Sequence, residues 1–510
     1  MQNNQRKRRR RKSVDWFVGR LAVVLCVFVA FIFVVSVIST GLLPTKFIVL
    51  LALILLLFAA LVGLLTRSSR YRVQYIIGLI LSLILCVLYV VGTVYVSKTM
   101  NTAKTITTVK TETAAVGIYV RADDPNDFDQ VAGSYTYGIL TEQDRENTDE
   151  AIKQISEEYG VTLSTKAYDG LPLLMDGLFA SEVDAIIVNS AYIGLLEELE
   201  GYEDAASKIR EVEITHVERE IEVVQTAPDA DEIPDDRLVG TVDEDEAGQD
   251  GLTFTVFISG IDTRGALTEK SRSDVNILAS INTATKQVVL ISTPRDYYVP
   301  LSISNGAKDK LTHAGIYGVN VCMDTMAMLY NVNVDYYFRV NFGGFIDIID
   351  ALGGVTVNSE VAFSTDSGYS FVQGDNYVDG TSALAFVRER YAFASGDRQR
   401  GKNQLALIKA VINKALSPEL LTNYSSVLSA LEGSFETSIP YDTLSSIVRE
   451  QLDKGGDWNI VSYSVDGTGD SQIPYSMSQY AYVMVPDEST VETAKSLIAQ
   501  VYNGETVVAP

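Results

Sequence analysis

The sequence predicts an α/β protein in three parts: an N-terminal membrane region of three helices, a small α/β accessory domain, and a larger α/β domain whose central mixed β-sheet is flanked by helices. Three observations carry this prediction. Three long stretches near the N-terminus lack charged residues, β-rich runs alternate with helical stretches in the rest, and an acidic segment divides that rest in two. The predicted bounds are 1–20 for a basic tail, 21–97 for the membrane helices, 103–225 for the accessory domain, 226–251 for an acidic linker, and 252–510 for the larger domain with a C-terminal helical extension.

The charge-free stretches at 21–39, 47–65 and 73–96 predict three transmembrane helices. At a rise of about 1.5 Å per residue, each is long enough to cross a hydrocarbon core of about 30 Å. A buried soluble helix or a cleaved signal peptide is the alternative for any single stretch. Three such stretches in succession argue against both alternatives.

Basic residues flank these helices unevenly. Seven lie between Arg6 and Lys12 and three lie between residues 67 and 72, whereas the first loop contains only Lys46. By the positive-inside rule, the N-terminus is cytoplasmic and the chain beyond Ser97 is extracellular, as in a multi-pass protein of the cell membrane. A nucleic-acid-binding arm is the alternative for the basic tail, but contact with anionic lipid explains the tail without a further assumption.

The formal net charge of -24 averages two unlike regions. Residues 1–97 hold twelve basic residues and one acid, so the other 413 residues hold 29 basic and 64 acidic residues. The second region therefore carries a net charge of -35, which argues against nucleic acid as a partner.

Cysteine and histidine are too rare for several kinds of site. Cys322 is the one cysteine in the acidic region, which excludes an internal disulfide or a Cys-rich metal site there. His216 and His313 are the two histidines of the chain, so a His-x-x-x-His zinc site is excluded. A Ser-His-Asp triad would depend on one of them.

The region 103–225 is expected to form the accessory domain because short β-rich runs alternate there with helical stretches. No cluster of convergent polar groups is evident, so a structural or partner-binding role is expected. The segment 226–251 is rich in acids and contains two prolines, which is typical of a solvated linker. A calcium loop is the alternative, but the EF-hand spacing is absent.

The larger domain is expected to begin with three strands at 253–260, 273–282 and 287–293, followed by helices at 317–330 and 342–352. If the strands pair as neighbours, up, down and up, the end of the first, the start of the second and the end of the third share one sheet edge. The residues predicted at that edge are Asp262, Arg272, Asp274 and Arg295.

Two carboxylates at one sheet edge, Asp262 and Asp274, suit a hard divalent cation such as magnesium, which takes oxygen ligands. A turn or cap role is the alternative for either residue. The sequence therefore raises a metal site as a hypothesis that depends on what else gathers at this edge.

Arginines strengthen the hypothesis. Arg388 and Arg390 are two residues apart, so on an extended segment they share one face. Arg400 precedes a predicted helix at 405–416, a place that suits a bound anion. The arginines predicted to converge are Arg272, Arg295, Arg388, Arg390 and Arg400. Because the guanidinium fork matches phosphate oxygens, a diphosphate is the expected ligand, although any single arginine could instead form a surface ion pair.

Six segments in order resemble the motifs of the LytR-CpsA-Psr family. They are GIDTRG (260–265), SRSDVNIL (271–278), STPRDYYVP (292–300), KLTHAGIYG (310–318), DALGGV (350–355) and VRERYAFASGDRQRGKNQ (387–404). Together with the three membrane helices and the extra domain, they are similar more narrowly to the streptococcal CpsA-type capsule proteins of that family.

The resemblance implies a magnesium-dependent phosphotransferase. It would move capsular polysaccharide or a related glycopolymer from an undecaprenyl-diphosphate carrier to peptidoglycan, with the prenyl chain in an apolar tunnel and contacts to capsule biosynthesis machinery. The roles implied are metal ligands for Asp262 and Asp274; diphosphate binding for Arg272, Arg295, Arg388, Arg390, Arg400 and Gln404; and catalysis for Arg388, Arg390 and Asp397, the last as a base or as a residue that orients the arginines.

Other functions remain open from the sequence. His313 is expected to be structural, because phosphoryl transfer needs neither a histidine nor a nucleophilic serine. An integral membrane regulator of capsule gene expression is one alternative, but residues 1–72 show no helix-turn-helix. A non-catalytic scaffold that binds the lipid carrier is the other alternative.

Overall fold

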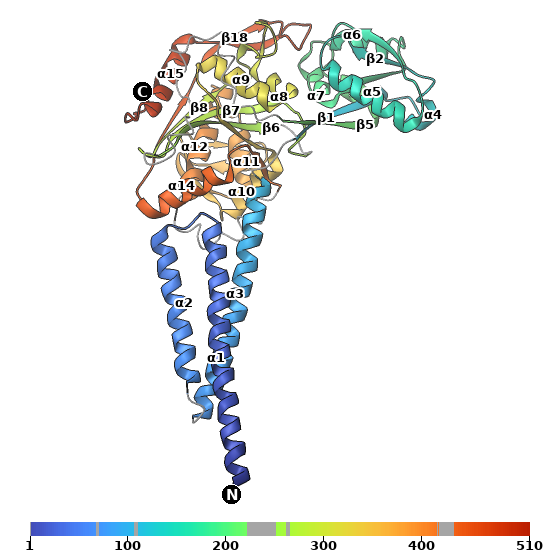
Figure 1. Ribbon diagram of the computed structural model, residues 1–510. Coiled ribbons are helices and arrows are strands. Elements are labelled where there is room, and N and C mark those ends of the chain that lie inside the picture. The colour runs from blue at the N-terminus through green and yellow to red at the C-terminus, as the bar shows by residue number, and fades with distance from the viewer. Residues whose placement is uncertain are drawn as a thin grey trace. The chain divides into compact units, whose positions relative to one another are not determined.

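The computed structural model describes residues 2–67, 71–106, 111–221, 251–261, 266–415, 417 and 433–510 (Figure 1). The chain divides into two compact units. One consists of Met1–Thr107 with Ile439–Gly456, and the other consists of Thr108–Ser438 with Asp457–Pro510. The predicted linker, 226–251, lies outside the described residues except for Gly251.

The three predicted apolar helices are confirmed, and each is long and apolar enough to cross a membrane. They are α1 (Gln2–Ser39), α2 (Thr45–Thr66) and α3 (Arg72–Ile106), which pack side by side (Figure 1). Cys26, Leu55 and Val62 are buried between them, whereas Phe31 and Leu57 are 64% and 71% exposed. An outer surface of large apolar side chains is what a lipid environment requires.

A helix from the C-terminal half belongs to the same unit as the membrane helices. In α14 (Tyr441–Lys454), the Tyr441 hydroxyl donates a 2.8 Å hydrogen bond to the Thr40 carbonyl oxygen. Lys46 Nζ lies 3.0 Å from an Asp453 carboxylate oxygen. The sequence predicts that helical runs near 420–453 complete the packing of the larger domain. That prediction is wrong for α14, and residues 418–432 lie outside the described residues.

The accessory domain is a five-stranded mixed sheet in the order β3-β2-β4-β1-β5. Its elements are β1 (Thr111–Arg121), α4 (Phe128–Val131), β2 (Thr136–Leu140), α5 (Arg145–Tyr159), β3 (Ser164–Tyr168), α6 (Leu171–Phe179), β4 (Ala185–Asn189), α7 (Ser190–Ile193), η1 (Leu196–Glu198), η2 (Ala205–Lys208) and β5 (Ile209–Glu220). The small α/β fold predicted from the alternating pattern is confirmed.

The larger domain has a six-stranded mixed sheet in the order β16-β11-β6-β7-β8-β17. Its strands are β6 (Thr253–Ile261), β7 (Ser273–Asn282), β8 (Gln287–Thr293), β11 (Tyr336–Val340), β16 (Phe435–Thr437) and β17 (Asn459–Ser464). Strands β6, β7 and β8 pair antiparallel as neighbours, which confirms the predicted up, down and up order. Their polar ends therefore share one edge.

Helices cover both faces of this sheet (Figure 1). On one face lie α9 (Val319–Tyr330) and α15 (Glu488–Tyr502), and on the other lie α10 (Phe342–Ala351), α11 (Gly380–Arg388) and α12 (Asp397–Ala415). Along β6 and β11 the side chains alternate: Phe257 and Tyr337 are buried in the core toward α9 and α15, whereas Ile258 and Phe338 face a cavity lined by α10, α11 and α12.

Shorter elements complete the larger domain. They are β9 (Tyr298–Pro300), β10 (Lys308–Lys310), η4 (Leu311–His313), α8 (Ala314–Tyr317), β12 (Val355–Ser359), β13 (Phe363–Ser364), β14 (Ser370–Phe371), β15 (Gly374–Val378), β18 (Gly467–Gln472) and β19 (Ala481–Pro486).

A buried ion-pair network joins the accessory domain to the larger domain. Arg339 of β11 donates to a Glu112 carboxylate oxygen of β1 over 2.5 Å and to Glu436 Oε2 of β16 over 2.6 and 3.0 Å. The side chains of Arg339, Glu112 and Glu436 are 3%, 8% and 4% exposed. Burial raises the pKa of Glu436, and the nearby Arg339 guanidinium opposes that shift. The network links the accessory domain to the larger domain, and both belong to one compact unit.

We expect Arg339→Met to destabilise the protein by about 3–5 kcal/mol, because it leaves two buried carboxylates without their cation. Chemical denaturation of the full-length protein in detergent measures this loss. Arg145→Met is the matched control, since Arg145 pairs with Asp149 at 38% and 53% exposure. That surface pair contributes less than about 1 kcal/mol. A loss for Arg339→Met no larger than that of the control would contradict the prediction.

Candidate functional site

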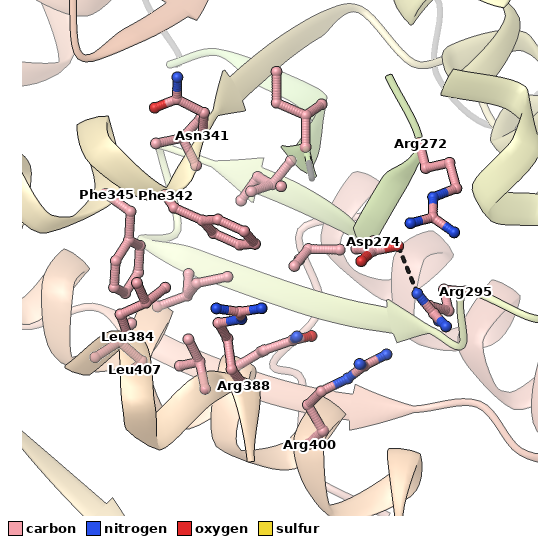
Figure 2. A pocket seen from close by; sticks show the side chains of 18 of the residues that line it. Arg272, Asp274, Arg295, Asn341, Phe342, Phe345, Leu384, Arg388, Arg400 and Leu407 are labelled. Carbon is pink, nitrogen blue, oxygen red and sulfur yellow. Dashed lines mark hydrogen bonds and ion pairs between the residues drawn. The ribbon is translucent and has the colours of Figure 1, made fainter. Parts of the chain in front are cut away.

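A cavity of about 750 Å³ lies between the sheet of the larger domain and helices α10, α11 and α12. Figure 2 shows its two chemically different ends: Arg272, Asp274 and Arg295 gather at one, and Phe345 and Leu407 lie at the other. The cavity is therefore amphipathic, and its polar end coincides with the sheet edge predicted from the sequence.

A β-bulge in β7 places Asp274 in the lining of this cavity. Gly260 pairs with Val275, and Ile261 pairs with Ser273, so Asp274 is the extra residue that has no partner on β6. The Ser273 and Ser259 hydroxyls lie 2.8 Å apart and brace the bulge from the neighbouring strand. A bulge bends its strand locally and changes where the extra side chain points. Here it brings the Asp274 carboxylate into the lining of the cavity.

Asp274 and Arg295 form the centre of the polar end. Arg295 Nη1 donates a 2.9 Å hydrogen bond to Asp274 Oδ1 (Figure 2). The Thr312 hydroxyl donates to the same oxygen over 3.1 Å. Arg295 Nε lies 3.7 Å from Asp296 Oδ2, and the Arg295 side chain is 15% exposed. These contacts fix the guanidinium at the sheet edge where β7 begins and β8 ends.

Arg272 lies beside them and contacts the accessory domain. Its Nη1 atom donates to Glu198 Oε1 over 3.0 Å and to the Gly194 carbonyl oxygen over 3.4 Å. The second oxygen of Glu198 accepts from Lys310 Nζ, which also lies 3.7 Å from Asp296 Oδ1. A continuous chain of charged groups thus runs from Arg272 to Arg295.

Within this row of charged groups, burial and neighbouring cations shift the pKa values of the carboxyl groups in opposite directions. Burial would raise the pKa of Glu198, but Lys310, His313 and Arg272 together lower the pKa of that carboxyl. Burial raises the pKa of Asp296 despite the attraction of Arg295 and Lys310. Glu198 therefore remains ionised at neutral pH and supplies a fixed negative charge at the edge of the cavity.

Arg388 and Arg390 both line the cavity, but not because they share a face of an extended segment. Arg388 ends helix α11, and the chain becomes extended only at Glu389. The expectation that Arg388 and Arg390 lie on one extended segment is therefore wrong. Arg388 lies over the Phe342 ring at 4.3 Å, and Arg390 over the Tyr391 ring at 4.7 Å, so aromatic rings support both guanidinium groups.

Helix α12 begins at Asp397, eight residues before the predicted start at 405. Arg400 and Gln404 consequently lie on its first two turns and line the cavity. Asp397 does not line the cavity, and its carboxylate pairs with Arg400. An acidic residue in the first turn interacts favourably with the helix dipole, which offsets the unfavourable interaction of Arg400 with the same dipole.

Apolar side chains from the three helices form the other end. The sheet contributes Ile258, Phe338 and Val340, and the helices contribute Phe342, Phe345, Ile348, Ile349, Leu384, Val387, Leu407, Ile408, Val411 and Ile412. No acidic residue lies among them. A long hydrocarbon chain suits this half of the cavity, because its burial removes apolar surface from water.

Asp262 lies outside the described residues, so its role as a metal ligand stays a prediction. Among the described residues, no three His, Cys, Asp or Glu side chains gather as a metal site. Asp274 nevertheless fits magnesium, because such sites in phosphoryl transfer commonly use one or two carboxylates together with substrate phosphates and water.

His313 and Cys322, which could otherwise support catalysis by an imidazole or a thiol, lie outside the cavity lining. His313 is fully buried, and its Nδ1 atom lies 2.7 Å from both an Asp309 carboxylate oxygen and the Ser476 hydroxyl. Cys322 belongs to α9 and is buried in the core, where burial raises the pKa of its thiol.

Several residues of the site were not predicted from the sequence. The polar ones are Glu197, Glu198, Lys310, Thr312 and Asn341. Lys310 and Thr312 lie in KLTHAGIYG, so that motif could have indicated them. Glu197 and Glu198 lie in an acidic stretch that resembles a solvated surface, and no sequence signal distinguished them.

A comparison with protein-family models identifies the family of this chain. A sequence model of the LytR_cpsA_psr family matches residues 220–497. The polyisoprenyl-teichoic acid--peptidoglycan teichoic acid transferase TagU of Enterococcus faecalis is 32% identical over 240 residues, which is 46% of this chain and 78% of the relative. The Bacillus subtilis protein of that name is 35% identical over 217 residues, 42% and 69% of the two chains. The solved structure of B. subtilis TagU is 30% identical, covers 51% of this chain and 99% of that one, and has a TM-score of 0.39.

Proposed function

Because the chain belongs to the LytR-CpsA-Psr family, we propose that it is a phosphotransferase that moves a glycopolymer from an undecaprenyl-diphosphate carrier to peptidoglycan. The observation that carries this proposal is the two-ended cavity, in which a cluster of guanidinium groups meets an apolar half. A prenyl diphosphate has the same two ends. Arginine's planar fork suits its phosphates, and the apolar half suits its chain.

The reaction proposed is a phosphoryl transfer. The oxygen of an acceptor hydroxyl on the cell wall forms a bond to the sugar-side phosphorus, and the bridging P–O bond breaks. Undecaprenyl phosphate leaves with the electron pair and, in the net reaction, takes up the hydroxyl proton. This chemistry asks the protein for positioning and for stabilisation of charge. Arg272, Arg295, Arg388, Arg390 and Arg400, with Gln404, are the residues proposed to bind the diphosphate. Asp397 pairs with Arg400, which supports a role in orienting that arginine rather than a role as base.

Magnesium is the cofactor proposed for this site. Asp274, together with Asp262 and phosphate oxygens, would hold the ion, which when bound supplies positive charge against the diphosphate. The contribution of the chain itself is to keep the Asp274 carboxylate in the bulge and in contact with Arg295.

The proposed setting is the outer face of the cell membrane. The N-terminus would be cytoplasmic and both α/β domains extracellular, because basic residues concentrate before α1 and between α2 and α3. Capsular polysaccharide or a related polymer is the proposed cargo, and capsule biosynthesis machinery is the proposed partner in the membrane.

The test supplies full-length protein in nanodiscs with a prenyl-diphosphate-linked glycan and peptidoglycan. Asp274→Ala and Arg390→Ala are each expected to lower the transfer rate by about 10²–10³-fold, as deletions of comparable charge-stabilising groups do. Transfer that survives both substitutions would contradict the proposal. Tight binding of the lipid by the wild type without release of prenyl phosphate would identify a scaffold instead.

A further inference from the structure

The accessory domain supplies part of the wall of the cavity. Glu197 and Glu198 of η1 line its polar end, although they lie outside residues 220–497, which match the family model. The site of this chain therefore contains carboxylates that the larger domain does not provide. These two carboxylates place negative charge beside the arginines that are proposed to bind an anion.

The segment that carries Glu198 is held firmly on the larger domain. The Asn189 side chain accepts a 3.0 Å hydrogen bond from the Ala191 backbone N–H and caps α7. The Tyr192 hydroxyl donates to the Tyr317 hydroxyl over 3.3 Å. Residues of both domains share one buried core at this point, namely Tyr192, Leu195, Leu196, Leu199, Ile316, Met477 and Ala481. Glu198 is thus presented to the cavity from a packed support.

Glu198 bridges two cations. One carboxylate oxygen accepts from Arg272 Nη1 over 3.0 Å and the other accepts from Lys310 Nζ. The three side chains are 17%, 16% and 4% exposed. Both bonds are charge-assisted and largely shielded from water, so the carboxylate constrains the guanidinium and the ammonium together.

We propose that Glu198 is a positioning residue of the transfer site: it holds Arg272 and Lys310 in place for the diphosphate, and its charge limits how tightly the site retains the prenyl phosphate product. The inference rests on the proposed function. It assigns the accessory domain a direct part in turnover.

The two effects of Glu198 have opposite consequences for binding and for turnover. Without its charge, the polar end gains net positive charge, and a phosphate monoester binds more tightly. Without its hydrogen bonds, Arg272 and Lys310 each lose a contact that fixes their orientation, so the transition state is stabilised less well. A residue that only stabilised the fold would weaken binding and turnover together when it was changed.

The experiment compares Glu198→Gln with the wild type as full-length protein in nanodiscs. We expect the dissociation constant of farnesyl phosphate to fall by about tenfold and kcat for glycan transfer to fall by about tenfold or more. Glu198→Asp keeps the charge but is shorter, so it should bind farnesyl phosphate like the wild type and recover part of kcat. Glu200→Gln removes a charge from an exposed residue two positions away and should change neither quantity.

A thermal unfolding curve for each variant shows whether the fold is intact. If Glu198→Gln folds normally but matches the wild type in affinity and kcat, or binds farnesyl phosphate more weakly, the inference is overturned. The same holds if affinity rises while kcat is unchanged. A wild type that transfers no glycan would instead overturn the proposed function, and the farnesyl phosphate affinities would still measure the charge effect of Glu198.

Discussion

Arg295→Met is expected to lower the rate of glycan transfer by about 10²–10³-fold. Methionine keeps much of the volume of the side chain but removes the donors that contact Asp274 and approach Asp296. Both carboxylates then lack their shared cation, and the polar end loses positive charge where the diphosphate is proposed to bind. Steady-state transfer by the full-length protein measures the effect, with thermal unfolding to report on the fold.

Arg398→Met is the matched control for this prediction. Arg398 is 48% exposed, pairs with Asp466, and does not line the cavity. It should retain transfer within a few-fold of the wild type. If Arg295→Met retained more than a tenth of wild-type activity in a folded protein, the diphosphate cluster would have to be assigned differently.

Ile408→Trp is expected to abolish binding of long prenyl chains while it spares short ones. Ile408 projects from α12 into the apolar end, so an indole there occupies space that the distal part of the chain would fill. Each methylene kept out of the cavity costs about 0.8 kcal/mol, so exclusion of only four of them weakens binding by about 200-fold. Geranyl diphosphate, which needs only the polar end and its surroundings, should bind within a few-fold of its wild-type affinity.

Lys409→Trp provides the control, because it introduces the same side chain at the adjacent, exposed position of α12. It should bind undecaprenyl phosphate like the wild type. Equal affinity of Ile408→Trp for short and long lipids, or an equal loss for both, would show that the apolar end does not hold the chain.

The sheet and its polar edge could be predicted from the sequence because strand periodicity is a local signal. Three β-rich runs with charged residues at alternating ends were enough to bring Asp274 and Arg295 to one edge. The helices that contain Arg388 and Arg400, α11 and α12, were harder to predict from the sequence. LAFVRERY contains β-favouring residues, yet a capping box at Asp379 and Ser382 starts a helix that runs to Arg388. Packing of this helix in the core outweighs its local preference.

The contribution of the accessory domain could not be predicted, because it depends on contacts between residues far apart in the chain. Glu198 meets Lys310 across 112 positions and Arg272 across 74. In the sequence, Glu198 is one of several acids in LLEELEGYED, each of which resembles a solvated residue. Only the fold separates Glu198, which is largely buried, from Glu200, which is exposed.

The bulge at Asp274 also sets a condition for engineering. Since Asp274 is an extra residue relative to β6, its place in the cavity depends on the number of residues in the strand as well as on their identity. A designer who copied the charged residues onto a regular antiparallel sheet would leave the aspartate on a different face. Deleting Asp274, the one residue between Ser273 and Val275, would restore a regular ladder of strand pairs and remove the carboxylate from the site. The transplantable part of this site is therefore an irregularity of the backbone, with its two supporting serines, rather than a set of side chains.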